Sequence, residues 1–371
     1  MKIAVGVFFL LALTGEFYAF EPAQFRFKLV HLIRALLVFY VFATRLSTLQ
    51  EVKFTVIGLL FGLGFQAFIG FWQWQIGPLR IPFFNIDQSW RVSGTIGVAN
   101  AFGLYLITLI PLCIRMALYS RLKSRVLWFI VSGLAIGSLL ATFTRGAWIG
   151  LLVSLAIFAF YDFKSHRLTK KQLSLLFFVG FSTITFFYVK YGHIITGRME
   201  DAEEALYSEK KHSRVGLAQD AIRIIRLHPL LGVGLDNYRY HADPEIAGLQ
   251  IVHNTYLLIA AEQGVFCALL FLMIYLSVLV KGLLLLKSPD PFIYHIGSAT
   301  LAGLTGALIY DMVAPDYRLA ELLIQHWRLL GMIIGLLIVS DFNLRRRALL
   351  LKQRKAAKER ITPRSSWIRP A

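Results

Sequence analysis

Residues 213–264 read SRVGLAQDAIRIIRLHPLLGVGLDNYRYHADPEIAGLQIVHNTYLLIAAEQG and form the longest polar segment between two apolar runs of the chain. Nearly all of the remaining sequence consists of apolar runs long enough to cross a membrane as helices. The segment contains an arginine at a predicted helix start, a glycine-containing turn and a histidine at the edge of the next apolar run. We therefore expect any chemistry of this protein to lie here.

The composition predicts an all-α polytopic membrane protein. Of the 371 residues, 57% are hydrophobic and 16% are charged, and the mean hydropathy is +0.62. A soluble domain carries roughly 25% charged residues, so a soluble fold is excluded. The net charge of +18 would suggest nucleic acid in a soluble protein. Here much of it lies in short loops and in the C-terminal tail, which favours membrane topology and contact with anionic lipid.

Apolar runs of spanning length predict about ten transmembrane helices. The first, KIAVGVFFLLALTG, is not followed by a small-residue cleavage site and is therefore interpreted as a span instead of a signal peptide. The expected spans lie near 2–19, 27–44, 53–73, 97–118, 126–143, 146–161, 172–190, 254–280, 293–313 and 322–341.

Basic residues in short loops predict that both termini face the cytoplasm. The cytoplasmic marks are the tail after residue 343 and two loops, which contain Arg115, Arg121, Lys123 and Arg125, and Lys164, Arg167, Lys170 and Lys171. The chain then divides into N-terminal transmembrane helices (1–190), a large outer loop with amphipathic helices (191–253), C-terminal transmembrane helices (254–341) and a cytoplasmic, lipid-facing or disordered basic tail (342–371). Because no nucleotide is available on the outer face, a reaction there needs a pre-activated donor.

Arg145 lies in ATFTRGAWIG, at the outer junction of two predicted spans. An arginine at this depth is costly and usually has a partner. It is either an interfacial anchor that reaches the headgroups or a ligand-binding group. The small neighbours Gly146 and Ala147 leave space for a ligand, which favours binding.

Arg214 follows Ser213, a good N-cap, in a helix that should end by His228 because Pro229 follows. The helical wheel places Val215, Ala218, Ile222 and Ile225 on an apolar face that Arg214 adjoins, and Asp220, Arg223 and Arg226 on a solvated face. A cation is disfavoured at a helix N-terminus, and a bound anion such as phosphate would offset this. The alternative is a salt bridge to an acidic residue such as Glu209.

His253 lies at the outer mouth of an apolar span whose helix is expected to begin at Asn254. A neutral imidazole there could accept a proton from a sugar hydroxyl; the alternative is a hydrogen-bonded interfacial histidine. Glu262 lies two turns deeper in the same helix and needs a partner or a proton. It would either orient the site or hold two helices together.

The segment HPLLGVGLDNY at 228–238 predicts turns at Gly232 and Gly234 and again at Asp236 and Asn237. It lacks the strand–helix context of a dinucleotide site. No metal site or cofactor is expected, because neither the histidines of the outer loop nor Cys113 and Cys267 have suitable spacing.

An earlier outer loop holds Arg91, in SWRVSGTIGVANAFGLYL. Arg91 would either add a third cation to an anion site or lie among the headgroups.

Together these motifs resemble the O-antigen ligase and polymerase superfamily, also called Wzy_C or O-antigen ligase-like proteins. The resembling segments are RVSGTIGVAN at 91–100, TRGAW at 144–148, SR at 213–214, HPLLGVGLDNY at 228–238 and HNTYLLIAAEQG at 253–264. Their order and spacing around a large outer loop are more specific than any one of them. Relatives often have about twelve spans, more than the ten expected here.

The resemblance implies a GT-C-like glycosyltransferase in the bacterial inner membrane, with its active site facing the periplasm. Such enzymes take a glycan from an undecaprenyl-diphosphate carrier. Ligases pass it to lipid A–core, polymerases to another carrier-linked repeat, and protein O-oligosaccharyltransferases to protein. By motif, Arg145 and Arg214 would hold the diphosphate and His253 would activate the acceptor hydroxyl. Apart from the motif match, we expect Arg91 as a further diphosphate-binding residue and Asp236, Tyr238, Asn254 and Glu262 in supporting roles. The mechanism is thought to be inverting and metal-independent.

Two other classes remain as alternatives. A transporter for a lipid-linked anionic glycan would place charges around a midplane cavity and often contain inverted repeats. The chain shows no internal repeat, and its distinctive cations cluster at the outer edge of the spans. A non-catalytic scaffold would leave the placement of Arg214 unexplained. We therefore expect an enzyme with O-antigen ligation as its leading assignment.

Overall fold

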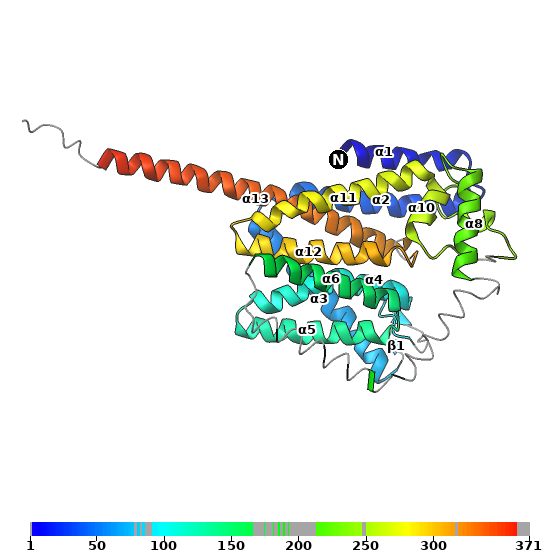
Figure 1. Cartoon of the computed structure of the whole chain (residues 1–371), viewed down its shortest axis with the longest axis horizontal. Coiled ribbons are helices and arrows are strands. Elements are labelled where there is room, and N and C mark those ends of the chain that lie inside the picture. The colour runs from blue at the N-terminus through cyan, green and yellow to red at the C-terminus, as the bar shows by residue number, and fades with distance from the viewer. Residues whose placement is uncertain are drawn as a thin grey trace, which may run out of the picture.

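The computed structural model is an almost entirely helical membrane protein (Figure 1). It describes residues 2–77, 80–81, 84–85, 91–165, 174, 181, 185, 188–189, 192, 213–246, 250–315 and 318–361. Within these residues, eight helices are long and apolar enough to cross a membrane. The only strands among them are the short antiparallel pair β1 (Arg80–Ile81) and β2 (Phe84–Asn85). The predicted fold class is therefore confirmed.

The eight candidate spans come from eight helices, of which α11 continues into the 3-10 helix η2 (Leu283–Lys287). They are α2 (Pro22–Arg45), α3 (Leu49–Gln75), α4 (Ala99–Tyr119), α5 (Leu122–Ala141), α6 (Arg145–Lys164), α11 (Val265–Gly282), α12 (Pro291–Tyr310) and α13 (Ala320–Ile361). The first predicted span corresponds to a shorter apolar helix, α1 (Lys2–Leu13) with η1 (Thr14–Phe17). The span predicted near 172–190 falls outside the described residues, apart from isolated positions.

The prediction of one continuous helix over 254–280 is wrong. The structure divides it at Gly264 into α10 (Thr255–Gln263) and α11. Gly264 has φ +87°, and a Cβ at this position would overlap the carbonyl of Leu230. Residues 229–230, which lie in the loop that follows Leu227, therefore fit into the break, and Val265 N–H donates to the Pro229 carbonyl at 2.9 Å.

The C-terminal tail begins as a continuation of the last predicted span. Helix α13 does not stop near residue 341 but continues without a break to Ile361, so residues 342–361 extend the helix beyond the bundle (Figure 1).

The centre of the bundle is built on close approaches at glycine. A Cβ on Gly150 of α6 would lie 2.9 Å from the Gly306 carbonyl of α12, and one on Gly331 of α13 would lie 2.6 Å from the Phe39 carbonyl of α2. In lipid, helix association depends on such packing because lipid tails are as apolar as leucine. Phenylalanines on the outer face of α3, such as Phe61, remain exposed and are suited to lipid contact.

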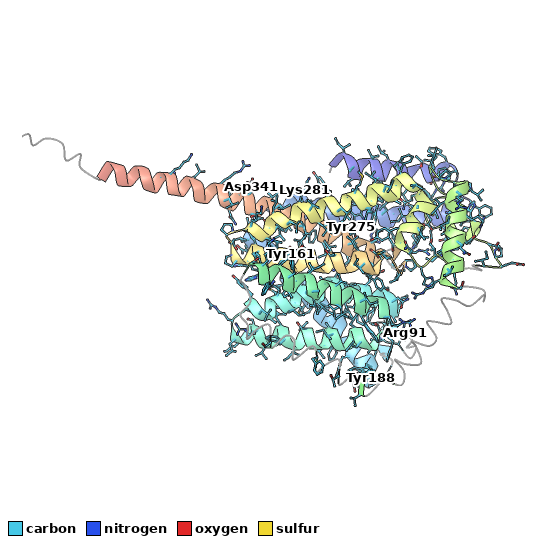
Figure 2. All side chains as sticks on the ribbon, viewed as in Figure 1. Arg91, Tyr161, Tyr188, Tyr275, Lys281 and Asp341 are labelled. Carbon is cyan, nitrogen blue, oxygen red and sulfur yellow. The ribbon has the colours of Figure 1, made fainter. Side chains whose placement is uncertain are left out.

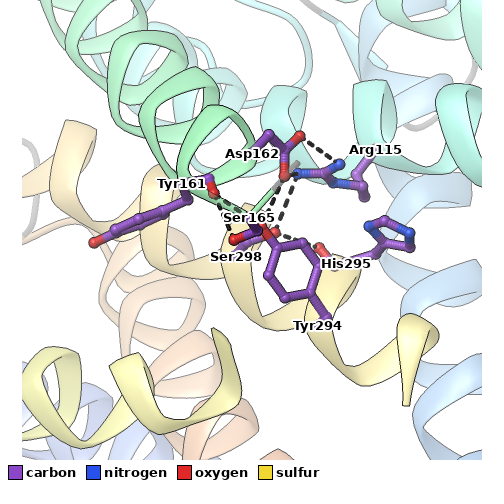
Figure 3. A network of polar contacts seen from close by, with 7 residues as sticks. All are labelled: Arg115, Tyr161, Asp162, Ser165, Tyr294, His295 and Ser298. Carbon is purple, nitrogen blue, oxygen red and sulfur yellow. Dashed lines mark hydrogen bonds and ion pairs between the residues drawn. The ribbon is translucent and has the colours of Figure 1, made fainter. Parts of the chain in front are cut away.

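A buried polar network joins α4, α6 and α12 at one end of the bundle (Figure 3). Arg115 Nη2 donates to Asp162 Oδ1 at 2.7 Å and to Ser298 Oγ at 3.2 Å, and Nη1 forms an ion pair with Asp162 Oδ2 at 2.7 Å. Tyr294 donates to Asp162 at 3.0 Å. Arg115 is only 1% exposed, so its prediction as a cytoplasmic loop mark is wrong.

The opposite ends of the bundle differ in charge. The end that holds Tyr161, Lys281 and Asp341 lies opposite the end that holds Arg91 (Figure 2). We call the first the basic end, because the helix ends and short links there carry Arg45, Lys53, Arg121, Lys123, Arg125, Lys164, Lys281 and Lys287. We call the second the site end. Positive-inside topology predicts that the basic end faces the cytoplasm.

Candidate functional site

The site end is built around the turn that precedes α6. Phe143 has φ +49°, a strained conformation for an aromatic residue, and Thr144 is the N-cap of the helix. Arg91 stabilises this turn by donating to the Thr142 carbonyl at 2.7 Å and to Thr144 Oγ1 at 2.8 Å. Arg91 also donates to Asn100 Oδ1 at 2.5 Å. The guanidinium of Arg91 therefore supports the protein turn next to Arg145, and the two predicted roles of Arg91 stay predictions.

Arg145 is the first residue of α6, and it is half-buried. The predicted open space beside it is not present. A Cβ on Gly146 would lie 2.7 Å from Val313 Cγ2 and 3.3 Å from the Tyr310 ring, and Ala147 is fully buried. These small residues serve close packing of α6 against the end of α12, so a ligand must reach Arg145 from another side.

The turn at the C-terminal end of α12, residues 310–314, joins three helix starts. Tyr310 donates through its hydroxyl to the carbonyl of Asn100, in the first turn of α4, at 3.0 Å. The Thr255 N–H donates to the Asp311 carbonyl at 2.8 Å, and Asn254 Nδ2 donates to the Met312 carbonyl at 2.9 Å. The start of α10 is thereby fixed beside the start of α6.

His253 directly precedes this anchored start. Asn254 caps α10 as predicted, since its Oδ1 accepts from Leu257 N–H at 2.9 Å. Within the described part of the chain, His253 Nδ1 is buried and has no hydrogen-bond partner. Burial, and then the positive charge of Arg214, lower the pKa of His253 below its ordinary 6.5. The imidazole is therefore neutral at pH 7.

Helix α8 (Arg214–Leu227) has the predicted ends but not the predicted face. Ser213 caps it by accepting from Gly216 N–H at 3.0 Å, and His228 is the C-cap. Val215 and Ile222, on the predicted apolar face, are 46% and 39% exposed, and the side of the helix that packs against protein is a different one.

The buried face of α8 consists of Leu217, Asp220, Ala221 and Ile224. It packs in a cluster with Tyr238 and Leu258, so it covers protein instead of lipid. Asp220, predicted to be solvated, is buried. Its carboxylate accepts from Arg223 at 2.8 Å and from Asp243 N–H at 3.1 Å.

Arg214 interacts electrostatically with both of the other predicted site residues. Partial burial, and then the charge of Arg145, lower the pKa of the Arg214 guanidinium, with an opposing effect from Tyr310. Its own charge acts on His253. Helix α8 therefore places Arg214 within electrostatic reach of Arg145 and His253. Glu209, the alternative partner of Arg214, lies outside the described residues.

Asp236 and Glu262 line a separate cavity of about 50 Å³, together with Lys28 and Arg318. Asp236 adopts φ +58° in the predicted turn and pairs with Arg318 and, at 3.6 Å, with Arg239. Burial raises the pKa of Glu262 to about 8.

Tyr238 links this cavity to α8, because its N–H donates to Glu262 at 3.4 Å and its hydroxyl donates to the Leu217 carbonyl at 3.3 Å. These contacts hold the loop after α8 against α10.

Sequence reasoning missed three residues around the site: Tyr310, Asp311 and Arg318. Tyr310 and Asp311 lie at the end of a predicted span, so the sequence indicates that they are near a membrane boundary. It does not indicate that they contact the starts of α4 and α10. Arg318, in the link to α13, carried the same signal that singled out Arg145, a cation next to a span.

No group of three or more His, Cys, Asp or Glu side chains suited to a metal ion occurs in the described segments. The rings of His228 and His241 lie 5.7 Å apart at the end of the 228–241 loop. The metal-free mechanism remains a prediction.

The fold is that of a multi-pass helical membrane protein, and at one end of it Arg214 lies within electrostatic reach of Arg145 and of His253. Residues 130–272 match the Wzy_C family model, described as O-Antigen ligase. The match includes Arg145, Arg214 and His253, and it confirms the resemblance indicated by the motifs. It supports a membrane glycosyltransferase-like ligase or polymerase function that acts on lipid-linked glycans and their acceptors. No curated protein matches the chain.

Proposed function

We propose that this protein transfers a glycan from an undecaprenyl-diphosphate carrier to an acceptor on the outer face of the bacterial inner membrane. The leading assignment is O-antigen ligation to lipid A–core. One observation carries the proposal: Arg214 lies within electrostatic reach of both Arg145 and His253 at the site end.

The pair of arginines supports an anionic donor. Each like charge disfavours the other, and the lowered pKa of Arg214 reflects this together with burial. A diphosphate between the two guanidinium groups would convert the repulsion into attraction and would accept bidentate hydrogen bonds. Both residues also begin helices, α6 and α8, whose N-terminal backbone N–H groups favour anions.

In the proposed reaction, neutral His253 accepts the proton of an acceptor hydroxyl. The oxygen attacks the anomeric carbon, and the bond from this carbon to the carrier diphosphate breaks. The electron pair leaves with the diphosphate, where Arg145 and Arg214 stabilise the developing charge. Attack opposite the leaving group inverts the anomeric configuration. In other reactions with a diphosphate leaving group, a metal ion stabilises the negative charge that develops on it. Here the two arginines do so.

Supporting residues act through position. Arg91 fixes the turn before Arg145, and Asn254 fixes the helix start after His253. Asp236, Tyr238 and Glu262 hold the loop between α8 and α10. We assign them to positioning and not to contact with the donor.

The test is the surface glycan of a strain that lacks this gene, complemented with the full-length chain or with its Arg214→Lys variant. We expect the deletion strain to carry lipid A–core without attached polymer. The unaltered chain should restore the attachment of polymer, and the Arg214→Lys variant should not. A single attached repeat indicates a polymerase and contradicts ligation. Unchanged glycans, together with no transfer by purified protein from an undecaprenyl-diphosphate glycan, contradict the proposed class.

A further inference from the structure

A groove of about 620 Å³ lies at the basic end, away from the proposed transfer site. Three helices form it: the first turns of α3, the last turn of α4 with the following link, and the start of α12. The buried Arg115 network ties α4 to α12 through Ser298 close by (Figure 3). Two of the three helices around the groove, α4 and α12, are therefore connected to each other by a buried hydrogen bond.

The groove combines two cations with an apolar wall. Lys53, near the start of α3, and Arg121, in the link after α4, both line it, and Val56, Ile57 and Met116 line the part toward the bundle. Lys53 Nζ lies 5.7 Å from the centroid of the Phe292 ring, a distance suited to a cation–π contact. Charge at the rim and apolar surface below it match an amphiphile with an anionic headgroup.

The carboxylates at this end are already engaged by the protein. Asp290, which lines the groove, accepts from the N–H groups of Phe292 at 2.9 Å and Ile293 at 3.3 Å. Glu51, nearby on α3, accepts from Ser47 N–H at 2.7 Å and Thr48 N–H at 2.9 Å. No ion pair joins Lys53 or Arg121 to a carboxylate in the described residues. Their charges remain available to an anion.

We propose that this groove binds one anionic phospholipid of the inner leaflet. Its phosphate lies between Lys53 and Arg121, and an acyl chain follows Val56, Ile57 and Met116. Basic pockets between transmembrane helices on the cytoplasmic side bind such headgroups, at about 1 kcal/mol for each cation near the surface. The site is independent of the proposed glycan transfer, because the groove lies at the other end of the spans.

The experiment measures thermal unfolding and native mass spectra of the full-length protein in detergent with added phosphatidylglycerol. Phosphatidylglycerol should bind in one copy and raise the melting temperature more than phosphatidylcholine or phosphatidylethanolamine does. Lys53→Ala and Arg121→Ala should each weaken the binding roughly fivefold, and high salt should weaken it further. Lys281→Ala, a cation at the same end outside the groove, is the matched control and should bind like the unaltered chain.

A second variant keeps the charges and fills the apolar part. Ile57 is about half exposed, so Ile57→Trp should fold and should displace the acyl chain while Lys53 and Arg121 remain.

Three outcomes overturn the proposal. Equal stabilisation by phosphatidylcholine or phosphatidylethanolamine contradicts an anionic site. Equal stabilisation by inorganic phosphate indicates a free anion instead of a lipid. Equal loss in the Lys281→Ala control, or unchanged binding in Lys53→Ala, Arg121→Ala and Ile57→Trp, contradicts this location.

Discussion

Arginines at the two ends of the bundle are held in opposite ways. At the basic end, Arg115 is 1% exposed and its charge is neutralised by two 2.7 Å contacts with Asp162. At the site end, Arg214 is only partly buried, the charge of Arg145 acts on it, and its own charge acts on His253. Neither of these neighbours supplies a negative charge. A buried cation that the protein itself neutralises stabilises the fold. Two cations placed near each other are suited to an anion from outside.

The ends also differ in how their helices meet. Near the basic end, side-chain pairs such as Arg115 and Asp162 connect the helices. At the site end, the 310–314 turn and the break at Gly264 connect them through backbone carbonyls and helix caps, and side chains such as Arg91 add to these connections. The proposed catalytic groups Arg145 and His253 therefore lie next to helix starts whose backbone is held by hydrogen bonds and close packing. The predictions below test this contrast.

The largest effect is expected at the proposed base. His253→Ala should lower the transfer rate by roughly 10²–10⁴-fold, the usual contribution of a general base, and should leave binding of the donor lipid mostly intact. An in vitro transfer assay with a separate donor-binding measurement gives both values. His241→Ala, in the same outer segment, is the control and should remain active. Full turnover by His253→Ala rules out the proposed proton transfer.

At the basic end, the largest effect should be on stability. Asp162→Asn leaves Arg115 buried without a counter-charge, which costs about 3–5 kcal/mol for a buried pair. The free energy of unfolding should fall by this amount. The control is Asp341→Asn, whose partner Arg345 lies at 2.9 Å on an exposed helix surface and which should change stability little. Equal effects from the two variants would remove the contrast between buried and exposed pairs.

At the site end, the positive charge of a lysine should not replace the planar guanidinium of an arginine in transfer. Arg145→Lys and Arg214→Lys keep the positive charge but lose bidentate contact with phosphate, so each should lower transfer by roughly 10²–10³-fold. Melting temperatures should hardly change. Arg226→Lys, on the exposed side of α8, serves as the control and should keep full activity. Retained transfer in all three variants would show that the arginines act only as anchors.

The break between α10 and α11 should depend on its glycine. Gly264→Ala places a methyl group against the Leu230 carbonyl at φ +87°, and this should cost at least about 1–3 kcal/mol of stability. Gly58→Ala on α3 meets no atom within 4 Å and should be neutral or slightly stabilising. Thermal unfolding compares the two. A similar melting temperature for both variants contradicts a specific role for the break.

The smallest effect concerns pH. Because the folded pKa of His253 lies below 6.5, the neutral base persists in mild acid, and the transfer rate should fall only below that value. Arg214→Gln removes a positive neighbour, so the pKa should rise toward 6.5 and the acid limb should move to higher pH. The rate as a function of pH and NMR titration of labelled histidine measure the shift. An acid limb above pH 6.5 in the unaltered chain contradicts the lowered pKa.

Local signals predicted most element ends. Ser213 and Asn254 as caps, His228 as the end of α8 and the turn at Asp236 are all present, because capping and turn residues act on backbone groups a few positions away. The helical wheel for α8 placed Asp220 on the solvated face because it took only the residue types of the helix into account. The buried face is instead decided by contact with Tyr238 and α10, and it includes Asp220.

The sequence by itself determined a helical multi-pass membrane protein, since runs of apolar residues must satisfy their backbone hydrogen bonds internally within lipid. It also indicated which cations were unusual, because charge at the edge of a span is costly. Only the tertiary structure decided what each one does. Asp162 lies 47 positions from Arg115, and the turn that fixes the start of α10 is 56 positions from Thr255. The periodic pattern of apolar and polar residues along one helix cannot predict such pairs. They depend on how α4, α6, α10 and α12 pack.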